Sequence, residues 1–516
     1  MTVFRFFAAL LSGLVIFFAY KKILHAGGYG TSFVPFFMAI PVFGLALNRK
    51  TTPISLLLSS LYAGYAIVFF LVNDSMGFNL EIILPEMLAI IADTNSSEVS
   101  TFLTNTTWRI FLPLLSSLLV IACLFIKESC IGRQWMYMVI PISVIMSGIV
   151  ATNKSFSINM SYSAVKDNLN MIEQSKEAAI LKSTFHWGAV SNISSKSTVL
   201  IVLGETTRGD HLNINGYPRD TTPLLAKEKV ISFTDVVSNG AYTLVSTPYI
   251  MTRKPVEKSG ISTLFGEKSV ISAYKEAGYK TYYVSYLSQA HVGDNAINQI
   301  VNEADIYIQR PVGEGDAEGI PIISDILRND SSEKKLIVFK LIGSHYNYQD
   351  RYPANFDVFK PSFKTQPYTT PTVEDAPVLV NTYDNTIRYT DYVVSELINL
   401  LKSESGDSLM SFISDHGTSI YDDGKTIYVG NTKSNYNIPL FFWFNGNAKA
   451  RLGEKLGVLI SNIGNPVDSK YFIDTMLDIS GIRTLKDTGK SLADKNVDIG
   501  VRYVVVGRDV VDYDSL

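Results

Sequence analysis

Two short apolar runs in this chain are each followed by side chains of the types that bind metal ions. Val199–Leu203 ends in a glycine, and the carboxylate of Glu205 comes next. Far downstream, Leu409–Ile413 ends in a serine, and the neighbouring side chains of Asp415 and His416 follow it. Carboxylate oxygen and imidazole nitrogen are ligands that a borderline metal such as zinc accepts together. The pattern therefore predicts one metal site that is assembled from distant parts of the chain.

The elements that must position these residues are two strands of one sheet. Runs this short and continuously apolar are typical of strands that are buried on both faces of a parallel sheet. Residues that follow such strands lie at the carboxyl edge, where open α/β sheets bind their ligands. A hydroxyl near Thr243 is a fourth candidate ligand. Gly417 would permit a turn that brings Asp415 and His416 to one ion. Taken alone, Glu205 could simply interact with a helix dipole, but the combination favours the metal site.

From residue 198 to residue 516, short apolar segments alternate with segments of helical periodicity. Such alternation predicts an α/β domain with a mainly parallel sheet. Besides the two runs above, we expect strands at Ile231–Val237, Thr281–Ser285, Leu336–Ile342 and Pro439–Phe444. We expect helices at Tyr383–Lys402 and Tyr471–Ile479.

The chain of 516 residues is 47% apolar, which is high for a soluble protein, and the excess lies in the first 150 residues, which is a membrane signature. We expect five transmembrane helices, at roughly Phe4–Tyr20, Ser32–Leu47, Ile54–Val72, Phe111–Ile126 and Met136–Val150. Because Lys and Arg in short loops favour the cytoplasmic side, the chain after the fifth helix is expected outside, in the periplasm of a bacterium. This orientation is supported by Arg5, Arg49, Lys50, Lys127 and Arg133 and opposed by Lys21, Lys22 and Arg109.

The composition divides the chain into three parts. We expect a transmembrane domain at 1–152, a linker at the membrane surface at 153–197 and a polar α/β domain at 198–516. The net charge of −3 at pH 7 gives no indication of a nucleic-acid partner. Cys123 and Cys130 lie in or beside an apolar segment, so the polar part is expected to hold neither a disulfide nor a Cys-based metal site.

Six segments resemble motifs of the phosphoethanolamine transferases and occur in the order of that family. The family consists of inner-membrane enzymes with the alkaline phosphatase/sulfatase fold. The segments are EMLAIIADTNSSEVSTFL (86–103), GETTRGDHLNINGYPRDTTP (204–223), SNGAYTLVSTP (238–248), IGSHYNYQDRYP (342–353), NTYDNTIRYTD (381–391) and SDHG (414–417). The resemblance implies five transmembrane helices followed by a periplasmic, sulfatase-like catalytic domain.

The resemblance also implies the roles of individual residues. Four of them would hold one tightly bound zinc ion: Glu205, Thr243, Asp415 and His416. Thr243 matches the threonine nucleophile of the family, and His345 matches a second active-site histidine. Histidine titrates near neutral pH, so His345 is a candidate general acid or partner of a phosphate oxygen.

The activity that the resemblance implies is a metal-dependent phosphotransfer between a lipid and a glycan. Phosphoethanolamine would pass from phosphatidylethanolamine to Thr243 and then to a cell-envelope glycan or glycolipid, with lipopolysaccharide lipid A or core as the expected acceptor. The sequence does not choose among lipid A, an inner-core sugar, a periplasmic glucan and a glycosylated protein. The transmembrane part would hold the site near the lipid headgroups.

Two residues depart from the family pattern. Thr418 stands where a glutamate is common, and Val429 stands where a histidine is expected before Gly430. The outer site for substrate or a second ion therefore lacks a ligand, which puts a second zinc ion in doubt.

Two alternative functions are also compatible with the sequence. One is a phosphoglycerol transferase on the same fold, and the other is a degenerate membrane protein that binds lipid or glycan without turnover. The GETTR motif at 204–208 and the 86–103 loop favour phosphoethanolamine over phosphoglycerol. Four intact residues argue against a degenerate site: Glu205, Thr243, Asp415 and His416.

Overall fold

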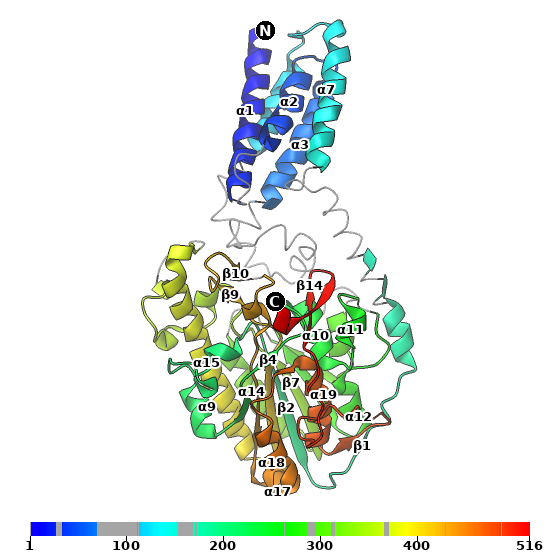
Figure 1. Ribbon diagram of the computed structural model, residues 1–516, viewed down its shortest axis with the longest axis vertical. Helices are drawn as coiled ribbons and strands as arrows, with labels where there is room; N and C mark the ends of the chain where they lie inside the picture. The colour runs from blue at the N-terminus through cyan, green and yellow to red at the C-terminus, as the bar shows by residue number, and fades with distance from the viewer. Residues whose placement is uncertain are drawn as a thin grey trace. The chain divides into compact units, whose positions relative to one another are not determined.

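The computed structural model describes the chain in segments: residues 2–26, 33–69, 111, 113–152, 169–170, 173–174, 176–262, 264–286, 296–310, 315–365, 371–428, 430–486 and 488–516. The chain divides into two compact units, Met1–Asn168 and Leu169–Leu516 (Figure 1). Val429, the 86–103 segment and residues 153–168 of the predicted linker lie outside the described residues.

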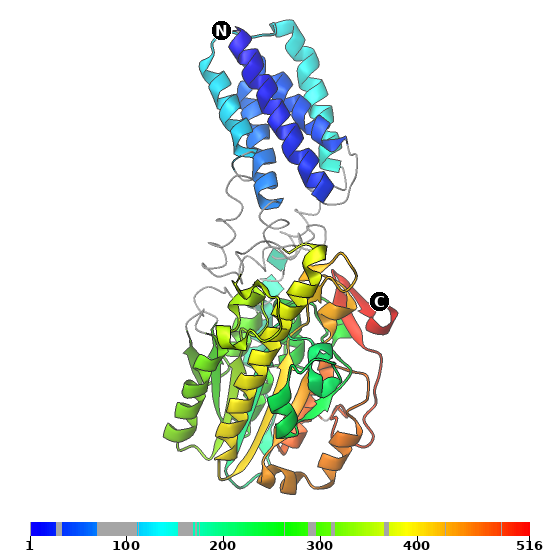
Figure 2. The ribbon, with the colours of Figure 1, turned by 90° about the vertical axis from the view of Figure 1, so that its left-hand side faces the viewer.

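The first unit is a bundle of apolar helices (Figure 2). They are α1 (Thr2–Ala26), α2 (Val34–Ala46), α3 (Thr52–Phe69), a helix at Pro113–Phe125, and α7 (Arg133–Thr152). Within the described segments, Thr2–Ile23 and Arg133–Val150 are long and apolar enough to cross a membrane. Val34–Ala46, Thr52–Ile67 and Pro113–Phe125 are shorter apolar helices, so five spanning helices stay a prediction.

Arg5 joins the ends of several helices of this bundle. Its Nη1 donates to the carbonyl oxygen of Ala46 and to the hydroxyl of Thr52, each at 2.9 Å. Its Nη2 donates to the carbonyl oxygens of Cys123 and Ile126. Carbonyl groups at the end of a helix have no partner within the helix, so a buried guanidinium that satisfies them ties the helix ends together.

The second unit is built on a seven-stranded sheet in the order β3-β11-β8-β2-β7-β5-β6. The strands are β2 (Ser197–Gly204), β3 (Ile231–Phe233), β5 (Lys280–Ser285), β6 (Ile306–Gln309), β7 (Lys334–Lys340), β8 (Asp407–Ser414) and β11 (Leu440–Phe444). β2 pairs in parallel with β7 and β8, and β5 pairs in parallel with β6 and β7. β11 runs antiparallel to both β8 and β3, so the sheet, which was predicted as mainly parallel, is mixed.

Helices cover both faces of this sheet (Figures 1 and 2). α15 (Ala376–Lys402) and α14 (Gly319–Asn329) lie on one face, and α12 (Val270–Glu276) and α19 (Phe472–Ile479) lie on the other. Every residue of β2 and β8 is buried, as their continuous apolar runs predict. The carboxyl edge of these central strands is therefore held rigidly.

The remaining elements are short. The helices are α9 (Pro223–Glu228), α10 (Thr243–Met251), α11 (Val256–Ser259), α13 (Ala296–Val301), α16 (Lys433–Tyr436), α17 (Gly446–Leu452) and α18 (Glu454–Ser461). The strands are β1 (Val190–Ser191), β4 (Val236–Val237), β9 (Ser419–Ile420), β10 (Ile427–Tyr428), β12 (Val467–Asp468), β13 (Ile482–Arg483), β14 (Tyr503–Val506) and β15 (Asp509–Asp512).

The strand predicted at Ile231–Val237 is wrong as a single strand. It is divided into β3, which joins the main sheet, and β4, which pairs with β12. Between them, Thr234 N donates to the carbonyl oxygen of Ile463, and the side chain of Asp235 forms an ion pair with Arg502. These contacts draw the chain away from β11, which an apolar pattern alone does not indicate. The helix predicted at Tyr383–Lys402 also begins earlier, at Ala376, because a proline occupies its first turn.

Candidate metal centre and active site

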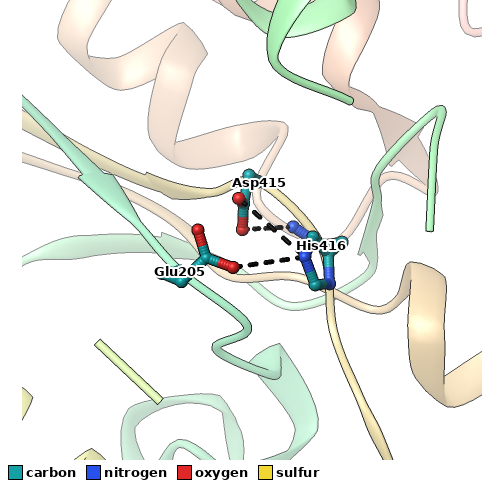
Figure 3. Close-up of side chains that lie close together, drawn as sticks. All are labelled: Glu205, Asp415 and His416. Carbon is teal, nitrogen blue, oxygen red and sulfur yellow. Dashed lines mark hydrogen bonds and ion pairs between the residues drawn. The ribbon is translucent and has the colours of Figure 1, made fainter. Parts of the chain in front are cut away.

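The register of the central strands brings Glu205 and Asp415 together. β2 and β8 run in parallel with Gly204 opposite Ser414, so the next residue of each strand stands at the same edge of the sheet. Both carboxylates are about 1% exposed. Figure 3 shows them converging with His416, which follows Asp415 directly. This is the arrangement that the two strand ends predicted.

The four predicted zinc ligands form one cluster. One ligand atom from each of Glu205, Asp415 and His416 lies within 4.8 Å of the others. The Oγ1 atom of Thr243 lies 3.0 Å from Asp415 Oδ2 and 3.5 Å from His416 Nε2. It also lies 3.4 Å from both carboxylate oxygens of Glu205. Within the described segments, this is the group of side chains that could hold a metal ion.

Neighbouring groups fix the direction in which these ligands point. His416 Nδ1 lies 2.7 Å from the carbonyl oxygen of Gly417, which can only accept, so Nδ1 carries the hydrogen and Nε2 faces the cluster. Asp415 Oδ1 accepts from the backbone N–H groups of Thr206 at 3.1 Å and of His416 at 2.8 Å, which leaves Oδ2 directed at the cluster. A side chain at Gly417 would lie 2.2 Å from the carbonyl oxygen of Ser434, so this turn requires glycine.

Thr243 reaches the cluster from a helix that the sequence pattern did not reveal. It is the first residue of α10, and it is 8% exposed. The amino end of a helix carries unpaired N–H groups and a partial positive charge, which favour a phosphate group. The hydroxyl therefore lies where the candidate metal ligands and a helix terminus meet.

Lys340 is the site residue that sequence reasoning missed. It is the last residue of β7 and pairs with Leu203 of β2, so it emerges beside Glu205. Its Nζ lies 2.7 Å from Glu205 Oε2 and 2.9 Å from Asp415 Oδ2. The signal was present in the run Leu336–Ile342, in which this lysine is the one charged residue. A lysine within a buried strand needs a partner.

Burial and close charges shift the pKa values of these groups. Burial opposes ionisation of Glu205, but the charges of Lys340 and His416 outweigh it and hold the pKa of Glu205 well below its usual range. Burial and the negative charge of Glu205 raise the pKa of Asp415. Burial disfavours a charged His416, but Asp415 and Glu205 raise its pKa to about 9. A proton and a metal ion would therefore compete for Nε2 of His416.

His345, the predicted second active-site histidine, lies in the turn after β7. Its Nδ1 lies 3.0 Å from the carbonyl oxygen of Tyr346, so Nδ1 carries a hydrogen in this contact. The preceding residue, Ser344, donates its N–H to the carbonyl oxygen of Glu205 at 2.9 Å. Gly343 adopts a positive φ of 56°, and a Cβ atom there would lie 2.7 Å from the same carbonyl. The turn thus packs directly against the Glu205 backbone, but its role in catalysis stays a prediction.

Thr418 takes part in a different network. Its hydroxyl lies 2.8 Å from the hydroxyl of Tyr348 and 3.4 Å from the carbonyl oxygen of Tyr428. The ring centroids of these two tyrosines are 5.5 Å apart. Thr418, which stands where a glutamate is common in the family, therefore supports an aromatic cluster beside the site.

The donor set fits zinc. Zinc takes four ligands from carboxylate, imidazole and similar donors in tetrahedral sites, and it prefers a histidine whose other nitrogen is hydrogen-bonded. Two carboxylates, one imidazole and one hydroxyl converge here, and the imidazole is oriented by a backbone carbonyl. These residues could therefore hold one zinc ion without rearrangement of the strands.

Known proteins share this architecture. The chain is 30% identical over 304 residues to phosphoethanolamine transferase EptA of Salmonella typhimurium. The aligned residues cover 56% of this chain and 54% of that protein. The chain spans about half the length of the curated relatives it matches.

Two solved structures show the same fold at lower identity. The periplasmic domain of EptC from Escherichia coli, solved in complex with Zn, has a TM-score of 0.56 and 24% identity, covering 64% of this chain and 96% of that one. The integral membrane protein lipooligosaccharide phosphoethanolamine transferase A (EptA) of Neisseria meningitidis has a TM-score of 0.63 and 18% identity, covering 96% and 97%. The sulfatase family profile matches residues 197–482, more than half of the sequence. The chain therefore belongs to the sulfatase family.

Proposed function

We propose that this protein transfers phosphoethanolamine from phosphatidylethanolamine to a cell-envelope glycan or glycolipid, with lipopolysaccharide lipid A or core as the expected acceptor. The observation that carries the proposal is the position of the Thr243 hydroxyl, within 3.5 Å of Glu205, Asp415 and His416. The names of the relatives support the choice of headgroup. A hydroxyl held by a metal ligand set at the amino end of a helix is suited to attack on phosphorus.

Glu205, Thr243, Asp415 and His416 would hold one zinc ion. When bound, zinc would lower the pKa of the Thr243 hydroxyl and offset negative charge on the phosphoryl oxygens. The strands β2 and β8 hold the two carboxylates in place, because both strands are fully buried.

In the first half-reaction, Thr243 Oγ1 attacks the phosphorus of phosphatidylethanolamine. The bond from phosphorus to Thr243 forms, and the bond from phosphorus to the diacylglycerol oxygen breaks. The threonine hydroxyl, which donates to Asp415 Oδ2 at 3.0 Å, loses its proton to solvent water as its oxygen attacks. The leaving diacylglycerol oxygen gains a proton, and His345 is the general acid that we assign to this step.

In the second half-reaction, an oxygen of the acceptor glycan attacks the phosphorus of phosphoethanolamine-threonine. The new bond joins phosphorus to the acceptor, the bond to Thr243 breaks, and the Thr243 oxygen takes a proton from solvent water. The acceptor oxygen loses a proton, which His345 can take because it has given one up in the first step.

The lipid donor gives the apolar helices a function. We assign residues 1–152 to five transmembrane helices in the bacterial inner membrane, 153–197 to a linker at the membrane surface and 198–516 to a catalytic domain in the periplasm. Thr2–Ile23 and Arg133–Val150 support this assignment, because each is long enough to span a bilayer. A site near the headgroup layer could bind the phosphodiester while the acyl chains stay in the membrane.

The proposal is tested with full-length protein in mixed vesicles. Headgroup-labelled phosphatidylethanolamine should label purified lipopolysaccharide, and the Glu205→Gln variant should reduce this transfer by several orders of magnitude. Labelled phosphatidylglycerol serves as the competing donor. Transfer from phosphatidylglycerol alone would assign the protein to phosphoglycerol transfer, and transfer from neither lipid would contradict the proposed function. Mass spectrometry of lipopolysaccharide and glucans from deletion and complemented strains identifies the acceptor.

A further inference from the structure

We propose that Lys340 is a permanent counter-cation of the metal centre, which stabilises the metal-free site and gives the zinc-loaded site the positive charge that a phosphodiester requires. Lys340 Nζ contacts Glu205 Oε2 at 2.7 Å, Asp415 Oδ2 at 2.9 Å and the carbonyl oxygen of Gly204 at 3.0 Å. The side chain is 4% exposed. The inference rests on the proposed zinc-dependent function.

The charges of the site explain why this lysine matters. Without metal, two carboxylates lie side by side in a buried site, where their repulsion is poorly screened. Lys340 bridges one oxygen of each carboxylate, and its positive charge adds to that of His416, whose Nε2 lies 3.2 Å from Glu205 Oε1. With zinc bound, and with His416 and Thr243 neutral, the charges of the ion and of Lys340 exceed those of the two carboxylates by one positive charge. A phosphodiester such as a phospholipid headgroup with a single negative phosphate charge is the matching substrate.

Groups other than Lys340 also hold the ligands in place. Asp415 is oriented by the backbone N–H groups of Thr206 and His416, which contact its other oxygen. Glu205 Oε1 accepts a hydrogen bond from the Thr206 hydroxyl at 2.8 Å. Removing the charge of Lys340 should therefore leave the ligands in place and make them attract zinc more strongly.

A lysine with a purely structural role would behave differently. Its removal would loosen the strand end, so the stability of the metal-free protein and its affinity for zinc would both fall. The counter-cation predicts opposite effects, because loss of the charge destabilises the metal-free carboxylates but favours a divalent cation between them. The sign of the change in zinc affinity therefore separates the two roles.

The test compares Lys340→Met with Lys335→Met in the full-length protein. Lys335 lies on the same strand, is 1% exposed, and donates to the carbonyl oxygen of Ser332 at 2.9 Å. It pairs with Thr198 at the opposite end of β2, so its removal tests the general cost of losing a buried lysine. Zinc affinity is measured by competition with a chelator, and stability by the thermal midpoint with and without zinc.

We expect Lys340→Met to lower the metal-free midpoint, to bind zinc at least about tenfold more tightly and to raise the KM for phosphatidylethanolamine more than it lowers kcat. Lys335→Met should leave zinc affinity and KM unchanged. Lys340→Arg keeps the charge and should retain the wild-type zinc affinity, which controls for a folding defect in the Met variant.

If Lys340→Met folds in the presence of zinc but binds the ion no more tightly than wild type, the inference is overturned. A wild-type protein that binds no zinc would instead contradict the proposed function. In that case the thermal midpoint of the metal-free protein still tests whether Lys340 stabilises the two carboxylates. An unchanged midpoint in Lys340→Met would exclude that role.

Discussion

The hydroxyl oxygen of Thr243 lies 3.0 Å from Oδ2 of Asp415, although 172 residues separate the two along the chain. One residue opens the helix α10, and the other follows the buried strand β8. Because both come from rigid elements, the distance is set by the fold and not by a flexible loop. The proposed nucleophile and a proposed metal ligand are thereby held in contact before substrate arrives.

Removal of a predicted metal ligand should remove the metal. Asp415→Ala and His416→Ala should each lose most of the bound zinc, because three donors from rigid elements hold the ion far less tightly than four. Elemental analysis of the purified protein measures this loss. His186→Ala is the matched control, since the His186 side chain is 75% exposed. A full equivalent of zinc in both site variants would refute the ligand assignment.

Gly343 should be required for the position of Glu205. A Cβ atom there would lie 2.7 Å from the Glu205 carbonyl oxygen in a backbone conformation with φ of 56°. We expect Gly343→Ala to cost about 1–3 kcal/mol of unfolding free energy and to reduce zinc binding. Gly278→Ala is the control, because Gly278 also has a positive φ of 86° but has open space around its Cβ position. Equal stability losses and intact zinc binding in both variants would show that the contact with Glu205 is unimportant.

Lys254 should make the protein less stable as the pH falls. Burial, followed by the charge of Lys182, lowers the pKa of Lys254 to about 7. A lysine whose pKa is lower in the folded protein contributes stability above its unfolded value of about 10.4, and this contribution is lost as the pH falls toward 7. Between pH 9 and pH 7 the expected loss is about 2–3 kcal/mol.

Lys254→Met should abolish this pH dependence. The free energy of unfolding of the zinc-saturated protein is measured with denaturant at pH 7 and at pH 9. The change between the two pH values is then compared between wild type and variant. Lys258→Met, an exposed position in the neighbouring helix α11, should retain the full wild-type slope. A Lys254→Met protein with the wild-type slope would show that Lys254 is not the responsible group.

The sequence predicted those parts of the site that lie in strong local patterns. Glu205 and Asp415 follow continuous apolar strands, and the carboxyl edge of a sheet is a position that such patterns locate. Thr243 was located by family resemblance, because the short helix α10 that it begins has no clear amphipathic period. Lys340 was missed because a charged residue near the end of an apolar run is usually taken to face solvent. Only the register of β7 against β2 shows that it emerges between two carboxylates.

Other parts of the fold depend on contacts between distant segments. Ile231–Val237 is divided into β3 and β4 where β4 pairs with β12 and where Asp235 forms an ion pair with Arg502, in the carboxyl-terminal part of the chain. The contact of Thr418 with Tyr348 joins two loops that no local pattern connects. Local periodicity carries no information on such pairs, so the strand break and the aromatic cluster required the structure.

The central claim is that Thr243 carries phosphoethanolamine between the two half-reactions, and mass analysis of the protein tests it most directly. Full-length protein is incubated with phosphatidylethanolamine without acceptor, digested, and analysed for phosphoethanolamine on the peptide that contains Thr243. We predict the adduct in wild type, a reduced amount in Thr243→Ser, none in Thr243→Ala, and its disappearance when lipopolysaccharide is added. An adduct on another residue, or near wild-type transfer by Thr243→Ala, would contradict the account.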